Sequence, residues 1–167
     1  NVKTDMNLVG ICNIENVMAS IGISMNAGVP MENILATIKR FVAVEHRIEY
    51  VATKKGVMYY NDSKATNTDS AIKALQAFKN GHVILLAGGY DKMTELEPMM
   101  QVVKEKTDLL ILLGNAKERF NEAALACGVE NIQIASSFED AVEKAYAAAM
   151  EPQVVVLAPA CSSYDMF

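Results

Sequence analysis

Four short polar segments stand directly after short apolar runs, and they hold the residues best suited to chemistry. Two of them are charged: residues 61–67 contain Asp62 and Lys64, and residues 88–92 contain Lys92. The other two are residues 114–115 and 159–163. Ammonium groups, hydroxyls and the unhindered backbone N–H groups at glycine bind carboxylates and phosphates well. We therefore expect these segments to form a site for a small anionic ligand.

Each of these residues also has a simple structural explanation when it is taken alone. Asp62 could cap a helix, Lys92 could be a solvated surface charge, and Gly88-Gly89 could be a tight turn. The sequence shows no histidine that could act as a base for Cys161, so a structural cysteine is favoured over a nucleophile. The argument for a ligand site is that the polar segments all follow strands, at the same end of each strand.

Composition and charge exclude several classes of function. The 167 residues carry a net charge of −5, which argues against nucleic acid and anionic membranes as partners. The longest apolar runs are too short to span a bilayer. Cys12, Cys127 and Cys161 are scattered, so we expect no disulfide and a cytoplasmic location. His46 and His82 lack metal-ligand neighbours at suitable spacing, so we predict no metal site.

The hydrophobic pattern alternates between helical and strand periods over most of the chain. Helices are predicted over residues 13–26, 30–41, 68–78, 96–105, 117–127 and 137–150. Strands are predicted over residues 49–53, 57–61, 83–87, 109–113, 132–135 and 154–158. In the third helix we expect Ala71, Ile72, Leu75 and Phe78 to face the core. Ser137 and the three residues after it resemble a capping box, which opens the last helix.

Three of the predicted strands are continuous apolar runs, at residues 83–86, 109–113 and 154–157. Strands that are apolar on both faces are typical of parallel sheets covered by helices on both sides. The sequence therefore predicts an α/β fold with a doubly wound, mostly parallel sheet. A lysine–glycine turn at residues 54–56 predicts an antiparallel hairpin at one edge. Ligands of such sheets bind beyond the carboxyl ends of the strands.

The first two helices precede the hairpin and are expected to belong to another domain. We predict a boundary between residues 1–43 and 44–167, and we expect the chain to be a piece of a longer protein. His46 and Arg47 lie just after this boundary, where packing or an ion pair is as reasonable as ligand binding. No G-x-x-x-x-G-K-[ST] or G-x-G-x-x-G motif occurs, so these residues are not expected to hold a nucleotide alone.

Five segments resemble motifs of the Mur ligases of peptidoglycan synthesis, in family order over nearly the whole chain. They are residues 13–16 (N-I-E-N), 45–49 (E-H-R-I-E), 60–67 (Y-N-D-S-K-A-T-N), 85–92 (L-L-A-G-G-Y-D-K) and 157–165 (L-A-P-A-C-S-S-Y-D). The N-D-S-K-A-T and P-A-C strings are typical of the branch that adds D-glutamate. The resemblance implies a Rossmann-like C-terminal domain at residues 44–167, preceded by the last helices of a central ATPase domain.

The resemblance also implies an activity and a set of site residues. The implied reaction uses ATP and Mg²⁺ to join D-glutamate to UDP-N-acetylmuramoyl-L-alanine through an acyl phosphate, in a monomeric enzyme. The ATP-binding positions are Asn16, Arg47 and Asp62. The catalytic position is Lys64, expected near the phosphates and the reacting carboxyl. The D-glutamate-binding positions are Thr66, Lys92, Ser163 and Tyr164. The main Mg²⁺ ligands of the family lie outside these 167 residues.

Two departures from the family pattern and two alternatives remain. Cys12 stands where the family's H-N-x-x-N motif has its histidine, and Ala43-Val44 stands where a glycine is usual. The first alternative is a related ligase, of the folylpolyglutamate type, that adds another amino acid. The second is a non-catalytic α/β module that only binds a ligand.

Overall fold

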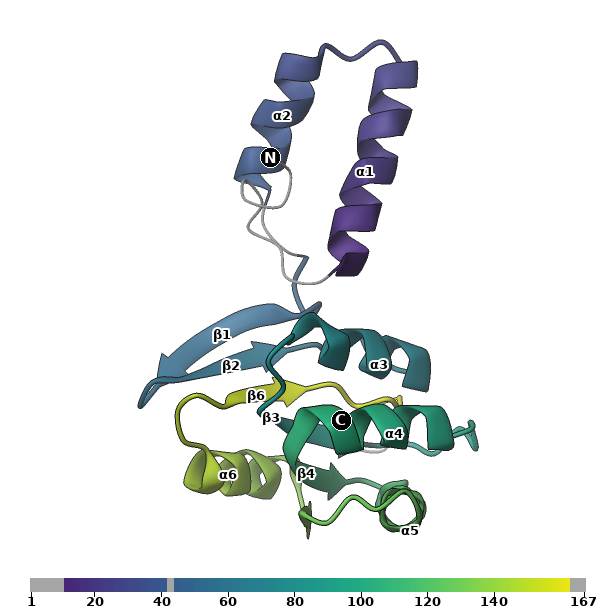
Figure 1. Ribbon diagram of the computed structural model, residues 1–167, viewed down its shortest axis with the longest axis vertical. Helices are drawn as coiled ribbons and strands as arrows, with labels where there is room; N and C mark the ends of the chain where they lie inside the picture. Colours follow the sequence, from purple (N-terminus) through teal and green to yellow (C-terminus); the bar gives the residue numbers. More distant parts are fainter. Residues whose placement is uncertain (1–10, 42–43, 163–167) are drawn as a thin grey trace. The chain divides into compact units, whose positions relative to one another are not determined.

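The computed structural model describes residues 11–41 and 44–162, and the chain divides into two compact units, residues 1–45 and 46–167. The first unit contains helices α1 (Ile11–Asn26) and α2 (Met31–Arg40), drawn in purple and blue in Figure 1. Gly28 has a φ of 78°, which suits the turn between the helices, and Pro30 stands just before α2, where its missing N–H costs nothing.

The second unit is built on a mixed sheet. Within the described residues its strands are β1 (Glu49–Lys54), β2 (Val57–Asn61), β3 (Val83–Gly88), β4 (Thr107–Leu113), β5 (Ile132–Ile134) and β6 (Val154–Leu157). They follow the order β1-β2-β6-β3-β4-β5 (Figure 1). The hairpin β1–β2 is antiparallel, and the other neighbouring strands are parallel. The predicted fold class, including the edge hairpin, is confirmed.

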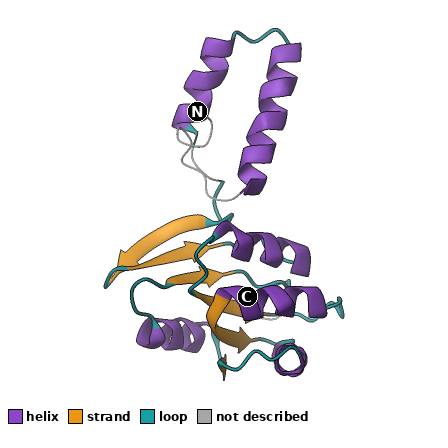
Figure 2. Ribbon diagram, viewed as in Figure 1, coloured by secondary structure: helices purple, strands orange, loops and turns teal. Residues whose placement is uncertain are grey.

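Helices cover both faces of this sheet (Figure 2). They are α3 (Thr68–Ala77), α4 (Glu97–Lys106), α5 (Lys117–Ala126) and α6 (Phe138–Ala148). Helices α3, α4 and α5 pack on one face of the sheet. Their buried side chains, which include Leu75, Met99 and Phe120, contact alternate residues of β3, β4 and β6. Ala141 and Ala145 of α6 pack on the other face. Because β3 is buried along its whole length, its unbroken apolar sequence is what two covered faces require.

Helix α3 turns the predicted residues toward the core. Ala71 and Leu75 are buried, Ile72 and Phe78 are partly buried against the same cluster, and Ala74 is a further buried residue that the prediction lacked. Phe78 does not continue the helix, because its backbone at φ −95° and ψ 90° leaves the helical region. Its ring packs instead against that of Tyr60, with the ring centroids 5.0 Å apart.

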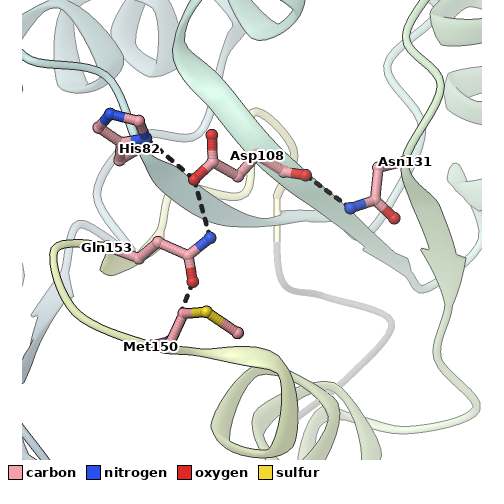
Figure 3. A network of polar contacts seen from close by, with 5 residues as sticks. All are labelled: His82, Asp108, Asn131, Met150 and Gln153. Carbon is pink, nitrogen blue, oxygen red and sulfur yellow. Dashed lines mark hydrogen bonds and ion pairs between the residues drawn. The ribbon is translucent and has the colours of Figure 1, made fainter.

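Polar side chains tie together the amino ends of the parallel strands (Figure 3). Gln153, just before β6, donates a hydrogen bond of 2.8 Å to the carboxylate of Asp108, and His82, just before β3, lies 3.2 Å from the same oxygen. Asn131, just before β5, donates to the Asp108 carbonyl at 2.7 Å. The polar side chains at this edge of the sheet therefore pair with one another. Among the described helices, none is long and apolar enough to cross a membrane.

Candidate functional site

The carboxyl ends of β2, β6 and β3 lie side by side, because these strands are neighbours and parallel. The segments that follow them form one edge of the second unit, which we call the strand-end site. It comprises residues 61–67, 88–94 and 158–162, together with residues 46–48 before β1, which are joined to it by the hydrogen bond from the Lys64 N–H to the His46 carbonyl. This is the edge where ligands of open α/β sheets bind.

Backbone hydrogen bonds hold the segment after β2 against the segment after β6. The Asp62 N–H donates to the Leu157 carbonyl at 2.8 Å, which extends the parallel ladder by one step. Further along, the Ala160 N–H donates to the Ala65 carbonyl, also at 2.8 Å. Residues 61–67 are thereby fixed beside residues 158–162.

A second pair of bonds joins the segment after β6 to the segment after β3. The Gly88 N–H donates to the Pro159 carbonyl at 2.8 Å, and the Tyr90 N–H donates to the Ser162 carbonyl at 2.9 Å. Ser162 is buried. It pairs with Tyr90 in a short antiparallel bridge. The three segments therefore form one continuous backbone platform.

Asp62 is a buried carboxylate at the centre of this platform, with 5% of its surface exposed. Burial raises its pKa, whereas a hydrogen bond from the Ile48 backbone N–H and the charge of Arg47 act in the opposite direction. Asp62 does not cap helix α3. That role belongs to Asn67, whose side-chain oxygen accepts from the Ser70 N–H at 2.8 Å.

A strained turn carries Arg47 and the Ile48 N–H to this carboxylate. His46 and Ile48 have φ values of 65° and 45°, in the left-handed region that a β-branched residue rarely adopts. Three contacts hold the turn in place. The His46 carbonyl accepts from the Lys64 N–H at 3.1 Å, the His46 N–H donates to Glu49 Oε2 at 2.8 Å, and the imidazole Nδ1 lies 3.0 Å from Asn61 Nδ2. His46 thus has a structural role that keeps Arg47 and Lys64 at the same edge.

Lys92 connects the segments after β3 and β2. Its ammonium donates a hydrogen bond of 2.8 Å to the Thr66 carbonyl, 26 residues away in the sequence. Lys92 is exposed and Thr66 is half-buried, so part of each side chain faces solvent beside the other. Lys92 is therefore an exposed charge whose ammonium group is also anchored to the segment after β2.

The glycine pair before Lys92 is required by the backbone. Gly88 has a φ of 120°, and a Cβ added there would lie 2.0 Å from the Leu113 carbonyl oxygen. Gly89 follows with a φ of 139°, and its carbonyl accepts from the Ala116 N–H at 2.9 Å. Only residues without a side chain let β3 leave the sheet this close to the end of β4.

One ion pair at the site is absent from the sequence-based prediction. Arg119 on α5 donates two hydrogen bonds of 2.7 Å, from Nε and Nη2, to the two carboxylate oxygens of Asp91. It donates a third, of 3.0 Å, to the Thr94 carbonyl. The Arg119 hydrogen bond lowers the pKa of Asp91, and the same bond raises the pKa of Arg119. No local pattern signalled this pair, because its members are 28 residues apart on different elements.

The structure brings together five of the eight predicted site residues: Arg47, Asp62, Lys64, Thr66 and Lys92. Asn16 lies on an exposed part of α1 in the first unit, whose position relative to the second is not determined. Ser163 and Tyr164, and the side chain of Cys12, lie outside the described residues. Arg47, Lys64 and Lys92 are all exposed. The described part of the predicted site is therefore a polar, largely cationic surface around one buried carboxylate.

The described residues fit the anionic part of a nucleotide better than they fit a metal ion. Arg47 and Lys64 are exposed cations held near one another by the turn at residues 46–48. In contrast, nowhere in residues 11–41 and 44–162 do three His, Cys, Asp or Glu side chains come close enough to hold a metal.

The chain matches a known protein family and named relatives. The model of the Mur ligase glutamate ligase domain matches residues 46–161. A UDP-N-acetylmuramoylalanine–D-glutamate ligase from Lachnospira eligens is 45% identical over 163 residues, which are 98% of this chain and 36% of that relative. The ligase of the same name from Caldicellulosiruptor bescii is 41% identical over 165 residues, again covering 36% of the relative. The chain thus spans about a third of the length of these relatives.

Solved structures show the same fold. A UDP-N-acetylmuramate–alanine ligase from Thermotoga maritima matches 93% of this chain and 36% of its own, with a TM-score of 0.75 at 15% identity. A folylpolyglutamate synthase from Mycobacterium tuberculosis, solved with ADP and AMPPCP, matches 94% of this chain and 39% of its own, with a TM-score of 0.71 at 18% identity. With the family model covering most of the chain, the protein belongs to the Mur ligase family, and residues 46–161 are its glutamate ligase domain.

Proposed function

We propose that this chain is the amino-acid-binding part of an ATP-dependent ligase that joins D-glutamate to UDP-N-acetylmuramoyl-L-alanine in the cytoplasm. The observation that carries the proposal is the hydrogen bond between Lys92 and the Thr66 carbonyl. It joins the N-D-S-K-A-T segment, which is typical of the D-glutamate-adding branch, to the loop after β3, which carries another of the family's motifs. The names of the relatives at 40–45% identity support the same substrate.

A dicarboxylic amino acid needs cationic and hydrogen-bonding groups around both carboxylates. Lys92 and the Thr66 hydroxyl would provide them, with Ser163 and Tyr164 completing the pocket. The amine of D-glutamate must be uncharged to attack, so the lysines should bind the carboxylates and stay away from the nitrogen. Holding the amine beside the activated carbonyl would then supply much of the rate gain through orientation alone.

The nucleotide would meet a different part of the strand-end site. When bound, ATP supplies the phosphoryl group that activates the substrate carboxylate. Lys64 would stabilise negative charge near that carboxylate, as the catalytic residue. Arg47 would bind the nucleotide beside Lys64, with Asp62 on the ribose and Asn16 near the adenine. The turn at residues 46–48, which holds Lys64 through the His46 carbonyl, would keep these cations in register. Mg²⁺ binding is assigned to parts of the ligase outside this chain.

Phosphate release by the full-length ligase tests the proposal. With UDP-N-acetylmuramoyl-L-alanine and ATP present, D-glutamate should stimulate release, whereas L-glutamate, D-aspartate and meso-diaminopimelate should not. Stimulation by another amino acid would favour a related ligase. Binding of D-glutamate without any phosphate release would favour a non-catalytic module. A Lys64→Ala variant is the control for contaminating phosphatases, and it should lose most of the activity.

A further inference from the structure

The ion pair between Asp91 and Arg119 lies directly beside the residue proposed to bind the substrate. Asp91 precedes Lys92 in the loop after β3, and the Asp91 carboxylate also accepts from the Met93 N–H at 2.8 Å. Arg119 adds its bond to the Thr94 carbonyl, so one guanidinium holds both ends of residues 91–94. The loop that carries Lys92 is thus fastened to α5.

Hydrogen bonds rather than packing hold this loop, because the side chains of residues 90–94 are half-buried or exposed. Met93 has a φ of 56°, in the left-handed region, and its side chain is 74% exposed. The direction of Lys92 is therefore set by hydrogen bonds, both its own bond to the Thr66 carbonyl and the Arg119 contacts at the base of the loop. The two parallel bonds from Arg119 fix both position and orientation, which a single contact would not do.

Charge provides a second reason for the pair. An unpaired Asp91 carboxylate, one residue from Lys92, would compete for the Lys92 ammonium and repel an anionic amino acid. Arg119 cancels that charge, and the side chains of Arg119 and Asp91 keep only 29% and 20% of their surface exposed. At this degree of burial the pair is less screened by water than a surface ion pair.

Building on the proposed function, we propose that Arg119 is a positioning residue for D-glutamate binding: it orients the Lys92 loop through Asp91 and masks the Asp91 carboxylate. Three of the five N–H groups of Arg119 already donate within the protein, so we assign it a positioning role and no direct contact with the substrate. Because Arg119 masks the Asp91 charge, removing Arg119 alone should weaken D-glutamate binding more than removing both charges together.

Three variants of the full-length ligase separate these effects: Arg119→Gln, Asp91→Asn and the double variant. Arg119→Gln should raise the KM for D-glutamate about tenfold, as expected when a charged hydrogen-bond partner is lost, with the KM for ATP unchanged. Asp91→Asn should raise it less, because the amide oxygen can still accept from Met93. The double variant should recover most of the loss. The control is Lys144→Gln, which removes a half-buried ion pair with Asp140 on α6, on the other face of the sheet.

The proposal is overturned if Arg119→Gln leaves the D-glutamate KM unchanged, if both KM values rise equally, or if the double variant is no better than Arg119→Gln. Failure of the proposed function looks different, because the wild-type ligase would then not respond to D-glutamate. In that case hydrogen–deuterium exchange tests the positioning role. Arg119→Gln should speed exchange in residues 88–94, and Lys144→Gln should not. If residues 88–94 exchange at the same rate in Arg119→Gln and in the wild type, the positioning role is rejected.

Discussion

The ammonium group of Lys92 lies 2.8 Å from the backbone carbonyl oxygen of Thr66. This contact spans the gap between the loops after β3 and β2, which are not neighbours in the sheet, since β6 runs between them. It therefore ties the loop that carries Lys92 to the segment after β2. A lysine held this way can add a carboxylate to its contacts without first being ordered, because part of the entropy cost is already met in the free protein.

Replacing Lys92 should therefore affect one substrate selectively. In the full-length ligase, Lys92→Ala should raise the KM for D-glutamate by roughly 10- to 100-fold, the range expected for loss of a charge-assisted hydrogen bond. The KM for ATP should change much less. Lys79→Ala is a matched control, because Lys79 is an exposed lysine before β3, at the opposite end of that strand. Equal rises in both KM values would reject the assignment of Lys92 to the amino-acid pocket.

Gly88 should be among the least replaceable residues of the second unit. Gly88→Ala would place a Cβ 2.0 Å from the Leu113 carbonyl at a φ of 120°, so backbone must move. We expect a loss of about 3 kcal/mol or more in the free energy of unfolding. Tyrosine fluorescence during urea unfolding can measure it, since all six tyrosines lie between residues 50 and 164.

Gly81→Ala separates the clash from the backbone conformation. Gly81 also has a positive φ, of 67°, but its added Cβ would meet nothing closer than 3.5 Å. Gly81→Ala should lower the free energy of unfolding by only about 1–2 kcal/mol, the cost of holding an alanine in the left-handed backbone region. If the two variants lose the same amount, the contact with Leu113 is not what fixes glycine at position 88.

Most of the fold could be predicted because its signals are local. The unbroken apolar runs of β3, β4 and β6 predict strands covered on both faces, and the sequence of Ser137 predicts the cap seen at 3.2 Å to the Asp140 N–H. Errors arose where tertiary contacts decide. The hydrophobic pattern extends the predicted helix to Phe78. In the structure the helix ends at Ala77, and the Phe78 ring packs against Tyr60.

The candidate site was predictable to a smaller extent. Parallel topology was enough to bring Asp62, Lys64 and Lys92 to one edge, because carboxyl ends of parallel strands share an edge. The partners of those residues were not predictable. The Asp91–Arg119 pair depends on which residues of α5 face the loop after β3, and that follows from helix packing. The burial of Asp62 depends likewise on the turn at residues 46–48.

The 167-residue chain by itself should not hydrolyse ATP. It has no G-x-x-x-x-G-K-[ST] sequence to hold the nucleotide phosphates, and its described residues form no metal cluster. Phosphate release by the purified chain should equal that of its Lys64→Ala variant and of a buffer blank. Release above the Lys64→Ala level would mean that the strand-end site alone binds and activates ATP.

Asp62 should reduce stability while supporting function. Asp62→Asn keeps the carbonyl oxygen that accepts from the Ile48 N–H, but it removes a charge from a site with 5% exposure. We therefore expect the variant to unfold at a higher urea concentration than the wild type at pH 7. In the full-length ligase it should raise the KM for ATP about tenfold, if the carboxylate binds the nucleotide as proposed.

The pH dependence of that stability difference tests the burial of Asp62 directly. Because burial raises the Asp62 pKa above its ordinary 3.8, the folded protein holds this proton at pH values where the unfolded chain has lost it. The stability of the wild type should then fall relative to Asp62→Asn as the pH rises from 3.8 through the raised pKa, and stay lower above it. Other carboxyl groups titrate in both proteins and cancel in the difference. A wild type that gains stability over Asp62→Asn across this range would show that Arg47 and the Ile48 N–H outweigh burial.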